Sequence, residues 1–202
     1  MTKINENKKQ IWLEKFDCFS ISGKDSKRFL NGITTGNIND LKNEVLKTCW
    51  LSPNGVLKSI LEIDGSKDQL EVIVFAGNTI EIRKYFKDII FPSDDVSLCE
   101  TYAINRLQEV DDKNSWRMNK PIFFKNDDKE NNLYKNNPNN MNDDELQLWK
   151  INQAIPKLNN EINGKNNPLE LGLVDLIDFN KGCYLGQETM SKIRNVSSLK
   201  QE

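Results

Sequence analysis

The segment from Lys181 to Glu188 reads KGCYLGQE and places several chemically active side chains close together. Gly182 and Gly186 flank a thiol and a phenol, and glycine lets the backbone turn sharply and approach a ligand closely. Cys183 follows a lysine by two residues, and a nearby ammonium favours the reactive thiolate form of a cysteine. The ring of Tyr184 can stack on a flat heterocycle. Ligand binding beside a reactive sulfur is therefore one interpretation of this segment.

A purely structural interpretation accounts for the same residues. Lys181 offers a cation, Gln187 an amide that donates and accepts, and Glu188 a carboxylate. The segment also fits a turn that starts a helix, with glycines for geometry, Cys183 buried as a small apolar residue and Glu188 at the positive end of the helix. Composition alone leaves both interpretations open.

The composition excludes several kinds of site. Histidine is absent from the 202 residues, which removes Ser-His-Asp and Cys-His catalysis and the commonest metal ligand. The four cysteines, Cys18, Cys49, Cys99 and Cys183, form no CxxC pair. We therefore expect no bound metal and a reduced cytoplasmic chain, in which the first three cysteines serve packing.

Charge and hydropathy limit the partners. Lys and Arg total 28 and Asp and Glu total 30, so the chain has no overall basic field for nucleic acid. The first ten residues are rich in Lys and Asn and contain no apolar run, and no apolar run elsewhere approaches the ~18 residues of a membrane span. The sequence predicts neither direct nucleic-acid binding nor membrane contact.

The elements that would position this segment mix strands and helices without regular alternation, which indicates an α+β fold. The turn signal Ser52-Pro53-Asn54-Gly55 predicts a hairpin. Residues 111–144 are rich in Asn, Asp and Lys and are expected to form a long loop region. The predicted strands are 16–21, 45–51, 56–63, 70–75 and 96–105, and the predicted helices are 25–32, 79–91 and 143–150.

The string KGCYLGQE resembles the signature of YgfZ-type proteins, which are relatives of the glycine cleavage T-protein. Further similarity lies in Asn167–Glu170, in Ile151–Pro156, and near the start in Phe29–Gly32. The resemblance extends from about Phe16 to Arg194 and is strongest at the signature. It implies a T-protein-like fold with mixed and antiparallel sheets, a ferredoxin-like lobe and a central folate pocket.

In that family a C-terminal β-barrel follows the signature, whereas this sequence ends at Glu202, soon after Glu188. The resemblance therefore predicts one folate-binding domain over residues 1–202, with lobes 11–105 and 106–202 and no barrel.

The resemblance implies a tetrahydrofolate-binding accessory protein that supports the assembly or repair of iron-sulfur proteins, including enzymes that modify transfer RNA. Its partners would be folate and iron-sulfur client or assembly proteins. Cys183 would act through redox chemistry or thiol exchange, because one cysteine cannot hold a permanent cluster. The residues implied to bind the cofactor are Asn37, Lys181, Gly182, Tyr184, Gly186, Gln187 and Glu188.

An aminomethyltransferase-like one-carbon transferase is the alternative. In T-protein enzymes an Asp helps to activate tetrahydrofolate, and alignment places Asn37 at that position, with Asp40 close by. An amide cannot ionise to act as a base, so turnover is not the first expectation. Asn37 is equally well explained as a turn residue. A module that keeps the fold and has lost the ligand is a third possibility.

Overall fold

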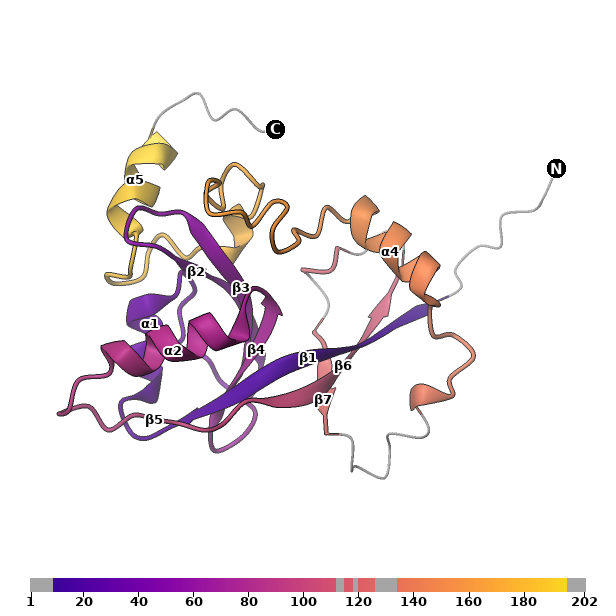
Figure 1. The fold of residues 1–202 in the computed structure, drawn as a ribbon, viewed down its shortest axis with the longest axis horizontal. Helices are drawn as coiled ribbons and strands as arrows, with labels where there is room; N and C mark the ends of the chain where they lie inside the picture. The colour runs from indigo at the N-terminus through magenta and orange to yellow at the C-terminus, as the bar shows by residue number, and fades with distance from the viewer. Residues whose placement is uncertain (1–8, 112–114, 118–119, 126–133, 196–202) are drawn as a thin grey trace. The chain divides into compact units, whose positions relative to one another are not determined.

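The computed structural model describes residues 9–111, 115–117, 120–125 and 134–195 (Figure 1). The chain divides into two compact units. The smaller unit combines residues up to Phe16 with Ala103–Ile155, and the larger unit combines Asp17–Tyr102 with the residues from Pro156 onward. This division differs from the predicted lobes 11–105 and 106–202, because each unit is assembled from two separate stretches of chain.

The larger unit contains an antiparallel sheet with the order β2-β3-β4-β1, and the short strand β5 also pairs with β1. Two helices, α1 and α2, supply Leu30, Ile82 and Phe86 to one hydrophobic core with the strands. The bounds are β1 Gln10–Ser22, α1 Ser26–Ile33, β2 Val45–Leu51, β3 Leu57–Asp64, β4 Leu70–Ala76, α2 Thr79–Ile89 and β5 Ser97–Leu98.

Alternation along the strands explains why the helices cover one face of this sheet. Phe19 and Ile21 of β1 point to the same side as Val72 of β4 and Leu61 of β3, and all four are buried in the helix-covered core. The opposite face carries polar side chains, among them Glu62 of β3. The sheet of the larger unit therefore has an apolar face, which the helices cover, and a more polar face on the opposite side.

The turn between β2 and β3 forms where the sequence predicts it, and a side-chain cap starts α2. In the turn between β2 and β3, Gly55 has a φ of +75°, and its amide donates to the carbonyl of Ser52 at 2.9 Å. Helix α2 begins after Asn78, whose side chain accepts hydrogen bonds from the amides of Ile80 and Glu81. These contacts fix the turn of the hairpin and the start of α2.

The smaller unit uses the first part of β1, followed by β6 (Tyr102–Val110) and β7 (Ile122–Phe124) in the order β1-β6-β7, together with α4 (Asp143–Asn152). Trp12 is fully buried, with the ring of Trp149 at 5.3 Å and the guanidinium of Arg106 at 4.2 Å. The capping box of Asn142 and Glu145 starts α4. Aromatic packing thus joins the helix to its strands.

The α+β class and the antiparallel sheet agree with the prediction, with two changes in the elements. The first strand begins at Gln10 rather than at Phe16. The predicted strand 96–105 is divided, because Ser97–Leu98 pairs with β1 before β6 begins at Tyr102. Part of the predicted loop 111–144 lies outside the described residues. The described part of this range includes strand β7.

No helix in the described part of the chain combines the length and apolar character that crossing a bilayer requires.

Candidate functional site

The signature segment lies against the bend that follows α1, within the larger unit. The amide of Asp178 donates to the carbonyl of Thr35 at 2.9 Å, and the amide of Leu185 donates to the carbonyl of Gly32 at 3.0 Å. In the opposite direction, the hydroxyl of Thr35 donates to the carbonyl of Leu176 at 2.7 Å. These bonds join two stretches that are far apart in the sequence.

The side chain of Lys181 is buried at the centre of this contact. Its Nζ donates to the carbonyl oxygens of Asn31 at 2.7 Å, Thr34 at 2.8 Å and Gly36 at 2.5 Å. Burial lowers the pKa of Lys181 to about 8, and the charge of Asp178 opposes that shift. An ammonium has three hydrogens, so these carbonyls use all its donors. Direct contact of Lys181 with a ligand remains a prediction.

Tyr184 is also turned inward, with only 6% of its surface exposed. The Nζ of Lys181 lies 5.3 Å from the centre of its ring. Burial raises the pKa of Tyr184 to about 12, and its hydroxyl has no hydrogen-bond partner among the described residues. Stacking on a ligand, which the sequence predicted, would require a face of this buried ring to become accessible.

The two glycines of the signature differ in their surroundings. Gly186 has a φ of +83°, and a Cβ there would lie 2.8 Å from the carbonyl oxygen of Ser52 and 3.2 Å from the Cα of Gly55. A Cβ on Gly182 would meet no atom within 4 Å. Gly186 is therefore required by its packing on the β2–β3 turn, whereas Gly182 leaves open space above the backbone.

The end of the signature forms a helix start. Helix α5 (Gln187–Asn195) begins at Gln187 and carries Glu188 in its first turn. Lys192 donates to Glu188 at 2.6 Å, and this bond lowers the pKa of the exposed Glu188 carboxyl. The structural interpretation of the sequence therefore describes this end of the segment well, but its expectation of a buried Cys183 is wrong because Cys183 is exposed.

The cysteines should differ sharply in reactivity. Cys18 and Cys49 are buried, whereas Cys99 and Cys183 are exposed. The expectation that Cys99 serves packing is thus wrong. We predict that a thiol-alkylating reagent modifies Cys99 and Cys183 in the native protein and modifies Cys18 and Cys49 only after denaturation, as read by mass spectrometry. Rapid native labelling of Cys49 would show that the bend over β2 opens easily.

A hollow of about 360 Å³ lies beside the signature in the larger unit. Asn37 lines it, and the Asn37 side-chain amide donates to the Asp40 carboxylate at 2.7 Å. The other lining residues are Gly36, Leu46, Lys47, Asp175, Leu176, Ile177, Asp178, Phe179, Asn180 and Arg194. The hollow therefore combines charges of both signs with an apolar and aromatic surface.

Two cations of this hollow are held in place by neighbours. The buried Lys47 lies 3.5 Å from Glu62 on the adjacent strand. The guanidinium of Arg194 on α5 lies 4.2 Å from the centre of the Phe179 ring. The predicted site residues did not include Lys47, Arg194, Asp175 or Asp178.

The structure brings some of the predicted residues together and separates others. Asn37 lines the hollow, and Asn180 continues its wall to the start of the signature. Among the described lining residues there is none from Lys181–Glu188. The signature thus packs against the residues that form the wall of this hollow and does not line it. Its residues Gly182, Cys183 and Glu188 are exposed on the surface.

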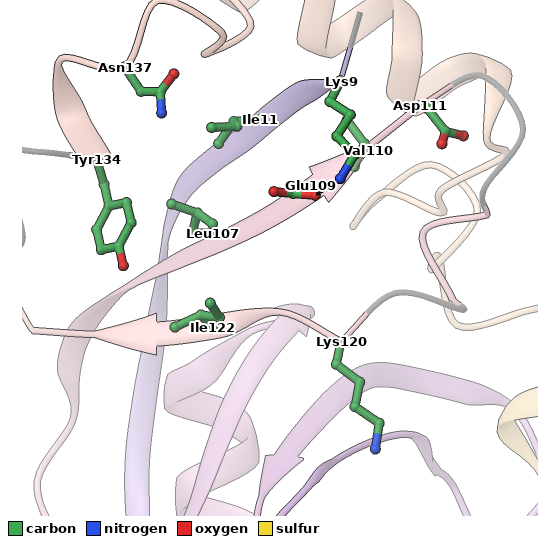
Figure 2. A pocket seen from close by; sticks show the side chains of 10 residues that line it. All are labelled: Lys9, Ile11, Leu107, Glu109, Val110, Asp111, Lys120, Ile122, Tyr134 and Asn137. Atoms are coloured by element: carbon green, nitrogen blue, oxygen red, sulfur yellow. Dashed lines mark hydrogen bonds and ion pairs between the residues drawn. The ribbon is translucent and has the colours of Figure 1, made fainter. Parts of the chain in front are cut away.

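A second hollow, of about 660 Å³, lies in the smaller unit (Figure 2). Ile11, Leu107 and Ile122 from its three strands form an apolar surface, with Tyr134 at one side. Lys9, Glu109, Asp111 and Lys120 add charges, and Lys9 pairs with Glu109 at 2.9 Å. None of the residues predicted for the site is among the described residues that line it.

The described residues contain no group of three or more Cys, Asp or Glu side chains arranged to hold a metal ion.

Comparison with known proteins gives relatives in sequence and in structure. No protein-family model matches the chain. An uncharacterized protein of Haemophilus influenzae is 25% identical over 205 residues, which cover 91% of this chain and 68% of that protein. A putative chloroplastic transferase of Arabidopsis thaliana is 40% identical over 52 residues, which cover 26% of this chain and 12% of that protein.

Among solved structures, the glycine cleavage system aminomethyltransferase T of Bartonella henselae matches with a TM-score of 0.70 at 10% sequence identity. The match covers 92% of this chain, and the chain spans 63% of the length of that structure. At this level of identity the likeness concerns the fold. The chain therefore has a T-protein-like α+β fold.

Proposed function

We propose that this chain is a cytoplasmic tetrahydrofolate-binding accessory protein that supports the assembly or repair of iron-sulfur proteins, including enzymes that modify transfer RNA. The T-protein-like fold is the observation that carries the proposal. Its further support is the KGCYLGQE segment, which resembles the signature of YgfZ-type proteins and packs beside a hollow in the larger unit.

The residues of the hollow suit the chemistry of a folate. The aminopyrimidinone edge of a pterin presents neighbouring N–H donors, and the carboxylates of Asp175 and Asp178 can accept them. Lys47 and Arg194 can meet the carboxylates of the glutamate. The volume of 360 Å³ falls within the usual range of about 300 to 1,000 Å³ for small-molecule pockets. Asn37 lines the hollow and is a proposed contact, whereas Gly182, Gln187 and Glu188 do not line it, and their contact with the ligand stays a prediction.

Cys183 is proposed to act on a client protein. Its exposed thiol, once it has lost its proton to solvent, can attack a client disulfide, forming a mixed disulfide and releasing the second client sulfur as a thiolate. Gly182 leaves the approach to this residue open. One cysteine in the signature suits such a transient bond better than the permanent holding of a cluster, which usually takes four ligands.

Calorimetry with 5-formyltetrahydrofolate tests the folate proposal, and we expect specific binding with a rise in melting temperature at saturation. Absence of both effects would favour a module that keeps the fold without the ligand.

Rescue of a strain that lacks its own YgfZ-type protein tests the role of Cys183. Cys183→Ala is expected to abolish rescue, while Cys99→Ala, which removes the other exposed cysteine, is expected to preserve it. Equal rescue by both variants would remove Cys183 from the mechanism.

A folate-dependent aminomethyltransferase is the second candidate, and the contact between Asn37 and Asp40 favours keeping it. The Asp40 carboxylate lies 2.7 Å from the amide of Asn37, which lines the hollow, so an acid lies next to the aligned position although that position carries an amide. Incubation with aminomethylated carrier protein and tetrahydrofolate tests this candidate. Absence of methylenetetrahydrofolate at high protein concentration would eliminate it.

A further inference from the structure

We propose that Lys181 is a positioning residue whose ammonium fixes the bend after α1 and thereby sets the Gly36–Asn37 wall of the 360 Å³ hollow. The proposal rests on the proposed function, since it concerns the same hollow. In this proposal the lysine of the signature affects ligand binding by holding the backbone in place, and it does not contact the ligand directly.

The position of the ammonium explains why a lysine is needed. A helix leaves its last carbonyl groups without partners inside the helix, and its C-terminus favours a positive charge. The carbonyls of Asn31 and Thr34 belong to the end of α1, and the carbonyl of Gly36 lies beyond it. One ammonium therefore joins the helix end to the bend, and burial excludes water that would compete for these acceptors.

The bend has little freedom to move once Lys181 holds it. The amide of Gly36 donates to the hydroxyl of Thr48 at 2.7 Å, and a Cβ on Gly36 would lie 3.0 Å from a methyl carbon of Leu46. Beyond Gly36, the amide of Ile38 donates to the side chain of Asn31 at 3.0 Å. Asn37 lies between these two anchored residues. The hydrogen bonds that hold Gly36 therefore fix the direction from which Asn37 faces the hollow.

Direct and indirect roles predict different behaviour toward ligands. If Lys181 contacted the glutamate of folate, its removal would weaken only ligands that carry that glutamate. If it sets the wall, removal weakens a ligand with the glutamate and one without it to the same extent. Affinity for 5-formyltetrahydrofolate and for 5-formyltetrahydropteroate, which lacks the glutamate, separates the two roles.

The experiment compares the wild type, Lys181→Met and Lys84→Met, because Lys84 is an exposed lysine on α2 in the same unit. Calorimetry with both ligands is combined with amide hydrogen exchange of Thr35 and Gly36. For Lys181→Met we expect an equal loss of affinity for both ligands, on the order of tenfold to a hundredfold, and faster exchange at these two amides. Lys84→Met should match the wild type in both measurements.

Three results would overturn the proposal: unchanged affinity in Lys181→Met, a loss confined to the glutamate-carrying ligand, or unchanged exchange at Thr35 and Gly36. If the wild type binds neither ligand, the proposed function fails, while the exchange measurement still decides whether Lys181 holds the bend. Should Lys181→Met not fold, Lys181→Gln, which keeps two N–H donors on a shorter side chain, replaces it in every measurement.

Discussion

Replacement of Gly186 by alanine is expected to destabilise the larger unit by about 2 to 4 kcal/mol. The first cause is the backbone, because a φ of +83° is unfavourable for any residue with a Cβ. The second is steric, since the new methyl group would lie 2.8 Å from the carbonyl oxygen of Ser52 and 3.2 Å from the Cα of Gly55. Both neighbours are backbone atoms of a tight turn and cannot rotate away.

Urea denaturation followed by circular dichroism measures this loss, and Gly182→Ala is the matched control. Gly182 lies in the same signature, but a Cβ there would meet no atom within 4 Å. Its replacement should therefore change the free energy of unfolding by less than about 0.5 kcal/mol. Equal effects of the two substitutions would show that the β2–β3 turn yields to the extra methyl group, which would contradict the tight packing of Gly186.

The elements with strong local signals could be predicted from the sequence. The run of β-branched and aromatic residues at 70–75 forms β4, and the turn at Ser52–Gly55 joins β2 to β3 as expected. The start of β1 at Gln10 could not be predicted in this way. The environment of Trp12 depends on Arg106 and Trp149, which are distant in the sequence, so the local pattern there does not reveal the strand.

The directions of the signature side chains also lay beyond sequence reasoning. Lys181 and Tyr184 are buried, and the two residues between them are exposed. This segment forms neither a strand nor a helix before Gln187, so no periodicity assigns its faces. The acceptors that draw Lys181 inward are carbonyl oxygens near the end of α1, and every residue type carries such a group.

Lys47 in the hollow was missed for a related reason. A lysine in a strand is ordinarily expected to face solvent. Counting outward from the predicted turn places Lys47 opposite Ile60, whereas an irregularity between Trp50 and Leu51 shifts the register so that Lys47 lies opposite Glu62. An opposite-charge pair across a hairpin is compatible with burial. The position of Arg194 could not be read from the local pattern either, because its place over Phe179 depends on how α5 packs.

The pH dependence of stability is expected to reveal the buried charge of Lys181. Burial lowers its pKa from the ordinary 10.5 to about 8 in the folded protein. Above that pH the folded state releases a proton that the unfolded chain still holds. Stability therefore rises with pH between about 8 and 10.5, by up to about 1.4 kcal/mol per pH unit, and this contribution is lost as the pH falls through 8.

The measurement is the difference in unfolding free energy between wild type and Lys181→Met, taken by urea denaturation at several pH values. Other titrating groups are common to both proteins and largely cancel in this difference, including Tyr184, whose pKa is raised to about 12. We expect the difference to shift in favour of the wild type by about 1 to 2 kcal/mol between roughly pH 7.5 and 9.5. A flat or falling difference would mean that the three carbonyls and the end of α1 stabilise the ammonium enough to outweigh its burial. Lys181 would then hold the bend after α1 with an ammonium that stays charged throughout this range of pH.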